Sequence, residues 1–285
     1  MVLEHLFPED WLEQKTKFAF LLGAGYSVIG ISIAKLLFPT DPALVAVAFT
    51  SLIMLPELYK LFGIEQRQLR EESSFSLPKL VHDEQDFVRI YLYLFLGILL
   101  VYSIATVVLP SFQVNDLFKQ QLDMRHRTGN AVFQHGLFQS ILVNNFFVLV
   151  ACFLLSLISG DGAIFLITWN ASVWGTIFGV TARNAALNAG VSAVYYLSLV
   201  LIIVFPHMLL EALSYILAAI SGGLISKNVL IERMDSSRFQ MVFRYNSAIF
   251  IGALVLLLIG ALVETLVLGN VSTYAKIIAQ SYGGI

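Results

Sequence analysis

Charge is scarce in this chain of 285 residues: 13% of the residues are charged and 58% are hydrophobic, which gives a mean hydropathy of +0.81. Soluble domains carry about 25% charged residues, so this composition excludes an ordinary soluble domain. The net charge of −2 provides no strong electrostatic attraction to nucleic acid, and we expect no nucleic-acid partner.

Cysteine and catalytic motifs are also lacking. Cys152 is the only cysteine, so no disulfide can form within the chain. No H-E-x-x-H zinc motif, G-x-S-x-G nucleophile turn or P-loop occurs, and we expect neither an enzyme nor a cofactor. The "SGDG" sequence at 159–162 resembles the aspartate setting of intramembrane proteases without their G-x-G-D order, and we interpret it as a tight turn between two helices.

What the sequence does contain is a series of apolar blocks of about 20 residues, the length with which an α-helix crosses a bilayer. They predict an all-α, polytopic transmembrane helix bundle with about seven spans plus one re-entrant or interfacial helix. The blocks are too long and too uniform for the strands of a membrane barrel. The predicted spans cover residues 18–38, 43–62, 88–109, 138–159, 163–182, 191–205 and 245–268.

Two parts follow from this division. Residues 1–87 form an N-terminal transmembrane hairpin with a charged cytoplasmic linker, and residues 88–285 form the main membrane domain.

Between the third and fourth spans, a stripe of apolar residues predicts a short helix on the membrane surface. The stripe consists of Val114, Leu117, Phe118 and Leu122.

Basic residues near the span ends predict the orientation, because cytoplasmic loops are enriched in Lys and Arg. The 60–89 linker, the 227–244 loop and the N-terminus are basic, so we expect a multi-pass protein of the cell membrane with a cytoplasmic N-terminus. The apolar run at 191–226 is too long for one straight span and too short for two. We therefore expect a break at Pro206 and a re-entrant helix near 206–226.

The sequence "FPHMLLEALSYILAAISGG" begins this predicted re-entrant helix and holds two ionisable residues, His207 and Glu211, four residues apart. On a helix they share one face with Ser214, Ala218 and Gly222. Ionisable groups within a membrane face the bundle interior and find partners. Two interpretations stay open: a structural hydrogen bond that fixes the helix, and a proton relay, ion relay or polar substrate site.

Other intramembrane residues suggest helix packing. Asn144, Asn145 and Asn170 are amides that need partners in hydrocarbon, and we expect hydrogen bonds between helices. Small residues repeated along a helix allow another helix backbone to come close. The expected close-packing residues are Ala171, Gly175, Gly179, Ala218, Gly222 and Gly223.

The segments at 141–179 and 205–226 resemble the stage II sporulation protein M family, and the resemblance covers roughly residues 88–268. The matching positions are Asn144, Asn145, Pro206, His207, Glu211, Gly222 and Gly223. The family usually has glycine after the histidine and proline soon after the glutamate, whereas this chain has Met208 and no such proline. The resemblance implies a membrane scaffold of the kind that anchors peptidoglycan-degrading partners during engulfment.

The function hypotheses follow from these observations. The first is a non-enzymatic integral membrane scaffold or membrane-organising protein that forms homo-oligomers in the lipid bilayer and recruits membrane or cell-envelope proteins. The second is a transporter, channel or permease-type subunit that uses His207 and Glu211 as an intramembrane polar site, since interrupted helices with ionisable residues line transport pathways. The third, an intramembrane hydrolase, lacks a nucleophile placed beside these residues.

Overall fold

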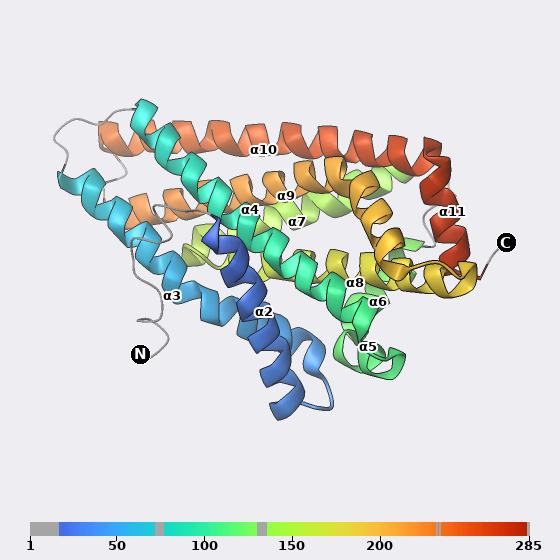
Figure 1. The fold of residues 1–285 in the computed structure, drawn as a ribbon. Helices are drawn as coiled ribbons and strands as arrows, with labels where there is room; N and C mark the ends of the chain where they lie inside the picture. The colour runs from blue at the N-terminus through green and yellow to red at the C-terminus, as the bar shows by residue number, and fades with distance from the viewer. Residues whose placement is uncertain (1–16, 72–76, 130–135, 232, 234, 284–285) are drawn as a thin grey trace.

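The computed structural model describes residues 17–71, 77–129, 136–231, 233 and 235–283, and within them it contains helices and turns but no strand. This confirms the all-α polytopic bundle (Figure 1). In the described ranges, six helices are long and apolar enough to cross a membrane, and the apolar first part of α3, Pro42–Pro56, is a seventh, shorter candidate. The helices are α2 (Phe18–Leu37), α3 (Pro42–Glu71), α4 (Leu77–Val108), α5 (Ser111–Leu117), α6 (Lys119–Gly129), α7 (Leu137–Ser159), α8 (Ala163–Ala189), α9 (Ala193–Ile231), α10 (Ser237–Asn270) and α11 (Ser272–Ser281).

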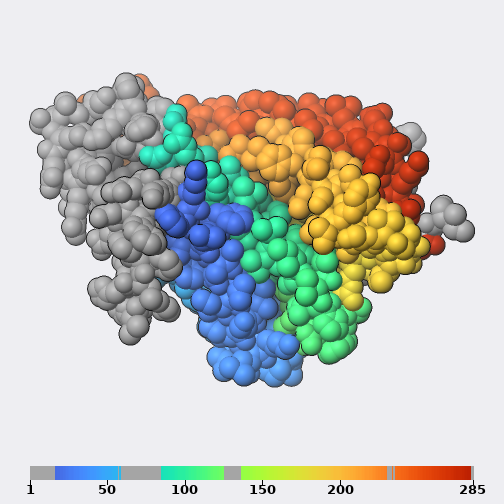
Figure 2. Space-filling view, viewed as in Figure 1, coloured from blue at the N-terminus to red at the C-terminus, as the bar shows by residue number. Residues whose placement is uncertain are grey.

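The core of the bundle forms where α4, α7, α8, α9 and α10 pack side by side. α9 makes its largest contacts with α10 and α7, while α4 lies between α8 and the α2–α3 hairpin. Among the largest fully buried side chains are Phe95, Tyr102, Leu149 and Tyr215. In the space-filling view, α10 follows one edge of the molecule (Figure 2).

One end of the bundle is held together by polar side chains from several connections. Arg183 of α8 donates hydrogen bonds to the carbonyl oxygen of Leu109 at 2.8 Å and to Ser111 Oγ at 2.7 Å. Gln120 of α6 donates to Asp41 in the α2–α3 turn at 3.1 Å. These bonds gather the α2–α3 turn, the α4–α5 connection and the last turns of α8 at one end of the bundle.

The α5–α6 segment corresponds to the helix that the apolar stripe predicted. Val114, Leu117 and Phe118 are buried, and the Phe118 ring lies 5.3 Å from the Tyr102 ring of α4. The segment differs from the prediction in being two short helices. Its apolar stripe packs against the protein itself, because Phe118 is enclosed by the end of the bundle.

The expected break in the helix at Pro206 is not observed. α9 continues through this proline from Ala193 to Ile231. Figure 1 shows α9 bending between a first part near the α8–α9 turn and a second part that lies along α7 and α10. A proline inside a helix removes one backbone hydrogen bond and bends the axis. The segment expected as a separate helix near 206–226 is the second half of this long, bent helix.

Candidate functional site: the polar contacts of α9

Glu211 lies where α7, α9 and α10 meet. Its side chain is buried, with the residue 3% exposed, and its Cγ atom would lie 3.1 Å from a Cβ built at Gly260 of α10. His207, one helical turn earlier, is 7% exposed. The absence of a side chain at Gly260 lets α10 approach α9 closely at this level, so Glu211 is enclosed by helices.

Two groups on neighbouring helices interact with the Glu211 carboxyl: the Glu264 carboxyl of α10 and the Asn145 amide of α7. Asn145 is buried, and Tyr215, one turn after Glu211, is within electrostatic range of both carboxyls. Glu211, Glu264, Asn145 and His207 are called the carboxyl-pair site below. The site combines residues from three helices that are far apart in the sequence.

Two buried atoms of the carboxyl-pair site have no hydrogen-bond partner among the described residues. They are Glu211 Oε1 and His207 Nδ1. An unsatisfied polar atom in a protein interior is costly and calls for an explanation such as a bound proton, ion or water. The carboxyl-pair site thus has unused hydrogen-bonding capacity in the interior of the bundle.

The position of the site along the bundle follows from where its residues lie in α7 and α10. Asn145 and Glu264 lie about 9–12 Å along their helices from Leu137, where α7 begins, and from Asn270, where α10 ends, at 1.5 Å per residue. Glu211 is therefore nearer to that end than to the end that holds Lys227. The re-entrant path is not confirmed, and the packing of residues 211–227 along α7 favours a full crossing.

The other predicted amides form local bonds. Asn144 is exposed and donates to Asn145 Oδ1 at 3.1 Å, and Asn170 donates to the carbonyl oxygen of Leu166 in its own helix at 2.8 Å. Only Asn145 of the three therefore reaches the carboxyl-pair site among the described contacts.

The predicted small residues lie at close helix contacts. A Cβ at Gly222 would overlap the carbonyl oxygen of Phe153 in α7, and a Cβ at Gly223 would lie 2.5 Å from the carbonyl oxygen of Gly160. Similarly, a Cβ at Gly175 or Gly179 of α8 would meet the α4 backbone at 2.5 Å. Ala171 and Ala218 are fully buried.

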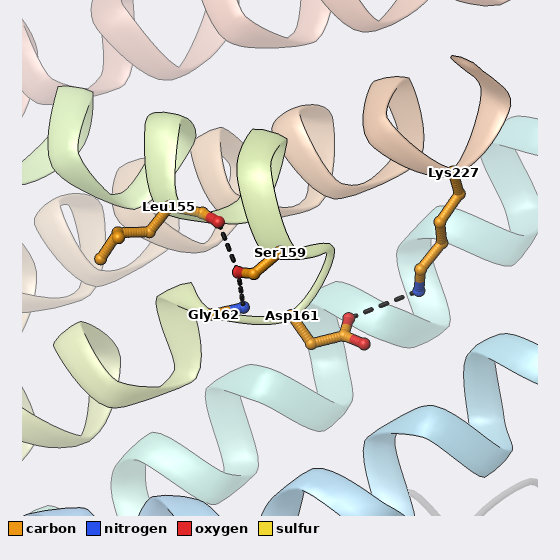
Figure 3. A network of polar contacts seen from close by, with 5 residues as sticks. All are labelled: Leu155, Ser159, Asp161, Gly162 and Lys227. Atoms are coloured by element: carbon orange, nitrogen blue, oxygen red, sulfur yellow. Dashed lines mark hydrogen bonds and ion pairs between the residues drawn. The ribbon is translucent and has the colours of Figure 1, made fainter. Parts of the chain in front are cut away.

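A second polar contact ties the end of α9 to the α7–α8 turn (Figure 3). Lys227 Nζ lies 3.4 Å from Asp161 Oδ1, with the Asp161 side chain fully buried and the Lys227 side chain 14% exposed. Within the turn, Ser159 Oγ donates to the carbonyl oxygen of Leu155 at 2.6 Å and accepts from the Gly162 N–H at 3.0 Å. Gly160 has φ 79°, a conformation that glycine adopts most readily.

Asp161 lies in the connection between two spans, and its ionisation depends on the balance of two effects. Burial raises the pKa of the Asp161 carboxyl from 3.8, and Lys227 opposes that rise by its charge and its hydrogen bond. The net pKa is raised, so desolvation outweighs the ion pair. The "SGDG" sequence thus forms a tight turn whose aspartate is buried and paired.

Comparison with protein-family models identifies the relationship. The model of stage II sporulation protein M matches residues 88–267. The chain belongs to the stage II sporulation protein M family. The match spans α7, α9 and nearly all of α10, and so includes the whole carboxyl-pair site. No curated protein and no solved structure matches the chain.

Membership of the stage II sporulation protein M family agrees with the resemblance that the sequence suggested. Glu264, in contrast, was not among the expected site residues, because a glutamate near a span end can extend to the membrane surface. Gly260, four residues earlier in the same apolar helix, is the one signal that this face of α10 contacts another helix.

Proposed function

We propose that this multi-pass membrane protein is a non-enzymatic scaffold that forms homo-oligomers and organises partner proteins in the bilayer. The observation that supports self-association is on α10, where Ala248 and Gly252 are exposed four residues apart. A Cβ at Gly252 would meet no atom within 4 Å, in contrast to Gly260 on the inner face of the same helix. Small residues at this spacing favour close helix association in membranes.

The surroundings of this small-residue pair are apolar, as an intramembrane contact requires. Ile251, Val255 and Leu258 are exposed on α10, so the helix presents a face that either lipid or a second copy can cover. Because lipid tails are as apolar as these side chains, close packing at Gly252 rather than hydrophobicity would favour the second copy.

The test is the oligomeric state of Gly252→Leu in lipid nanodiscs or mild detergent. Gly25→Leu is the matched control, since Gly25 is an exposed glycine of α2 that also has no atom within 4 Å of an added Cβ. We expect crosslinked oligomers to fall at least fivefold in Gly252→Leu and to persist in Gly25→Leu. A monomeric wild-type protein, or equal oligomerisation of both variants, would remove the support for self-association through α10.

The carboxyl-pair site supports a second candidate, a transporter, channel or permease-type subunit. Glu211 and His207 are ionisable residues on a bent transmembrane helix, the setting in which transport sites are built. Reconstituted liposomes can be assayed for flux of protons, common ions and a labelled lipid. Flux that disappears in a folded Glu211→Gln variant would support this candidate, and no flux from correctly inserted protein would reject it.

The orientation is part of the proposal. Arg233 lies in the α9–α10 connection, and Arg238 and Arg244 lie in the first turns of α10, so we place this end of the bundle and the N-terminus in the cytoplasm of a cell membrane. Single cysteines introduced at Arg233 and at Lys276 of α11, in a Cys152→Ala background, should be labelled from opposite sides of the membrane. Labelling of position 233 from outside would reverse the assignment.

A further inference from the structure

From the carboxyl-pair site, we infer that Glu211 and Glu264 bind one proton between them inside the bundle. The two carboxyls come from different helices and interact: Glu264 lies one turn beyond Gly260 on α10, and a Cβ built at Gly260 would lie 3.1 Å from the Glu211 Cγ atom. An ionised carboxylate offers only acceptors, so two ionised carboxylates cannot hydrogen-bond to each other. A carboxyl–carboxyl contact therefore requires a proton on one of the two groups.

The charges around the pair favour the same conclusion. α10 contributes Glu264 itself, α7 contributes the neutral Asn145, and α9 contributes Tyr215 and His207 on the turns beside Glu211. Among the residues that the structure describes, no lysine or arginine interacts with Glu211. Two negative charges in contact would repel each other within a low-dielectric interior, whereas a shared proton removes one of them.

One oxygen of the pair lacks a hydrogen-bond donor from the protein, which leaves a position at which a proton can bind. Glu211 Oε1 has no hydrogen-bond partner among the described residues, although Glu211 is 97% buried, being 3% exposed. No group of three or more metal-ligating residues occurs in the described part of the chain. One proton matches this two-carboxyl site, in which the neighbouring amide can donate one further hydrogen bond.

Proton binding has a structural consequence for α9. The Glu211–Glu264 contact joins α9 to α10 just after Pro206. Because this contact requires a shared proton, it is present only while the proton is bound. Raising the pH far enough to remove the proton would leave two charges in contact and loosen α10 from α9. This inference goes beyond the scaffold and does not depend on oligomerisation or on flux, since a proton can bind without being transported.

The test is infrared spectroscopy of the full chain in nanodiscs across a pH titration, with absorption by protonated carboxyls as the signal. Glu211→Gln and Glu264→Gln each replace one carboxyl by a neutral group of similar shape that can donate to the other. Asp116→Asn is the control, because Asp116 is exposed on α5. Circular dichroism and thermal unfolding establish that each variant is folded.

We expect a protonated-carboxyl signal in the wild type and in Asp116→Asn that persists above the pH at which exposed carboxyls ionise. Because the buried Asp161 also has a raised pKa, all variants are compared in an Asp161→Asn background, in which the signal should be lost completely in both glutamine variants. Its absence from the wild type, or its survival in both Glu211→Gln and Glu264→Gln, would overturn the inference. A signal that sodium removes at fixed pH, with higher thermal stability, would also overturn it by identifying a cation as the ligand.

Discussion

Replacing Lys227 by Met tests how α9 is fastened to the α7–α8 turn. The substitution keeps an unbranched, apolar side chain of similar length but leaves the buried Asp161 carboxylate without its ion-pair partner at 3.4 Å. At that separation and an effective dielectric constant of about 20, the attraction is about 5 kcal/mol before desolvation is counted. Losing one partner of a buried pair usually costs about 3–5 kcal/mol.

Proton uptake by Asp161 limits this loss. An aspartate with an unperturbed pKa of 3.8 can become neutral at pH 7 for about 4 kcal/mol, since each pH unit corresponds to about 1.4 kcal/mol. Because the Asp161 pKa is already raised in the wild type, the loss stays below this limit, and we expect Lys227→Met to lower the free energy of unfolding by about 2–3 kcal/mol at pH 7. At pH 4 the same substitution should cost about 1 kcal/mol or less, because protonation of Asp161 is then nearly free.

The assay is unfolding in mixed micelles of a mild detergent and SDS, at pH 7 and pH 4, for the complete mutant cycle. Asp161→Asn combined with Lys227→Met removes both charges and should recover the wild-type stability to within about 1 kcal/mol at pH 7. If the double variant is as unstable as Lys227→Met, or if the loss is equal at both pH values, packing of the lysine stem explains the effect and the electrostatic argument is refuted.

Three further predictions concern the turn and the helix contacts. Because burial raises the Asp161 pKa, the folded state binds the Asp161 proton more tightly than the unfolded state does. The free energy of unfolding of the wild type should therefore fall as the pH rises from 3.8 to the raised pKa. Asp161→Asn should abolish this component of the stability–pH curve. Gly222→Ala should lower the free energy of unfolding by about 1–3 kcal/mol in SDS titrations, since its Cβ overlaps the Phe153 carbonyl oxygen, whereas Gly25→Ala should change it by less than about 0.5 kcal/mol. Arg183→Met should cost about 1.5–3 kcal/mol and expose the α5–α6 segment to proteolysis, because it removes charged hydrogen bonds to that connection; unchanged cleavage would contradict this role.

The spans could be predicted because hydrophobic length determines which segments cross the bilayer. The predicted spans at 18–38 and 138–159 agree with α2 (Phe18–Leu37) and α7 (Leu137–Ser159) to one residue. Where the prediction was short, the helix extends beyond the apolar block: α8 continues to Ala189, and α10 begins at Ser237. Hydropathy marks the hydrocarbon portion of a helix, whereas polar helix-forming residues extend it into the interface.

The behaviour of Pro206 could not be predicted from the local sequence. A proline costs about 3 kcal/mol within a helix, which favours a break when only local terms are considered. Neighbouring helices in a membrane can compensate for that cost, and α9 packs against α7, α8 and α10. The carboxyl pair was missed for a similar reason, because the partner of Glu211 depends on which helix lies beside α9.

The contacts of α9 restrict how the protein can change shape. Glu211 and Lys227 are about 24 Å apart along the helix at 1.5 Å per residue, and each contacts a group anchored on or beside α7. Between them, Gly222 lies directly against the α7 backbone, so sliding of this half would produce steric overlap along the contact. A movement that preserves these contacts must carry the second half of α9 together with α7, and it must bend at Pro206, where the helix already lacks a backbone hydrogen bond. The carboxyl pair lies one to two turns beyond that bend, so gain or loss of its proton would act where α9 can move.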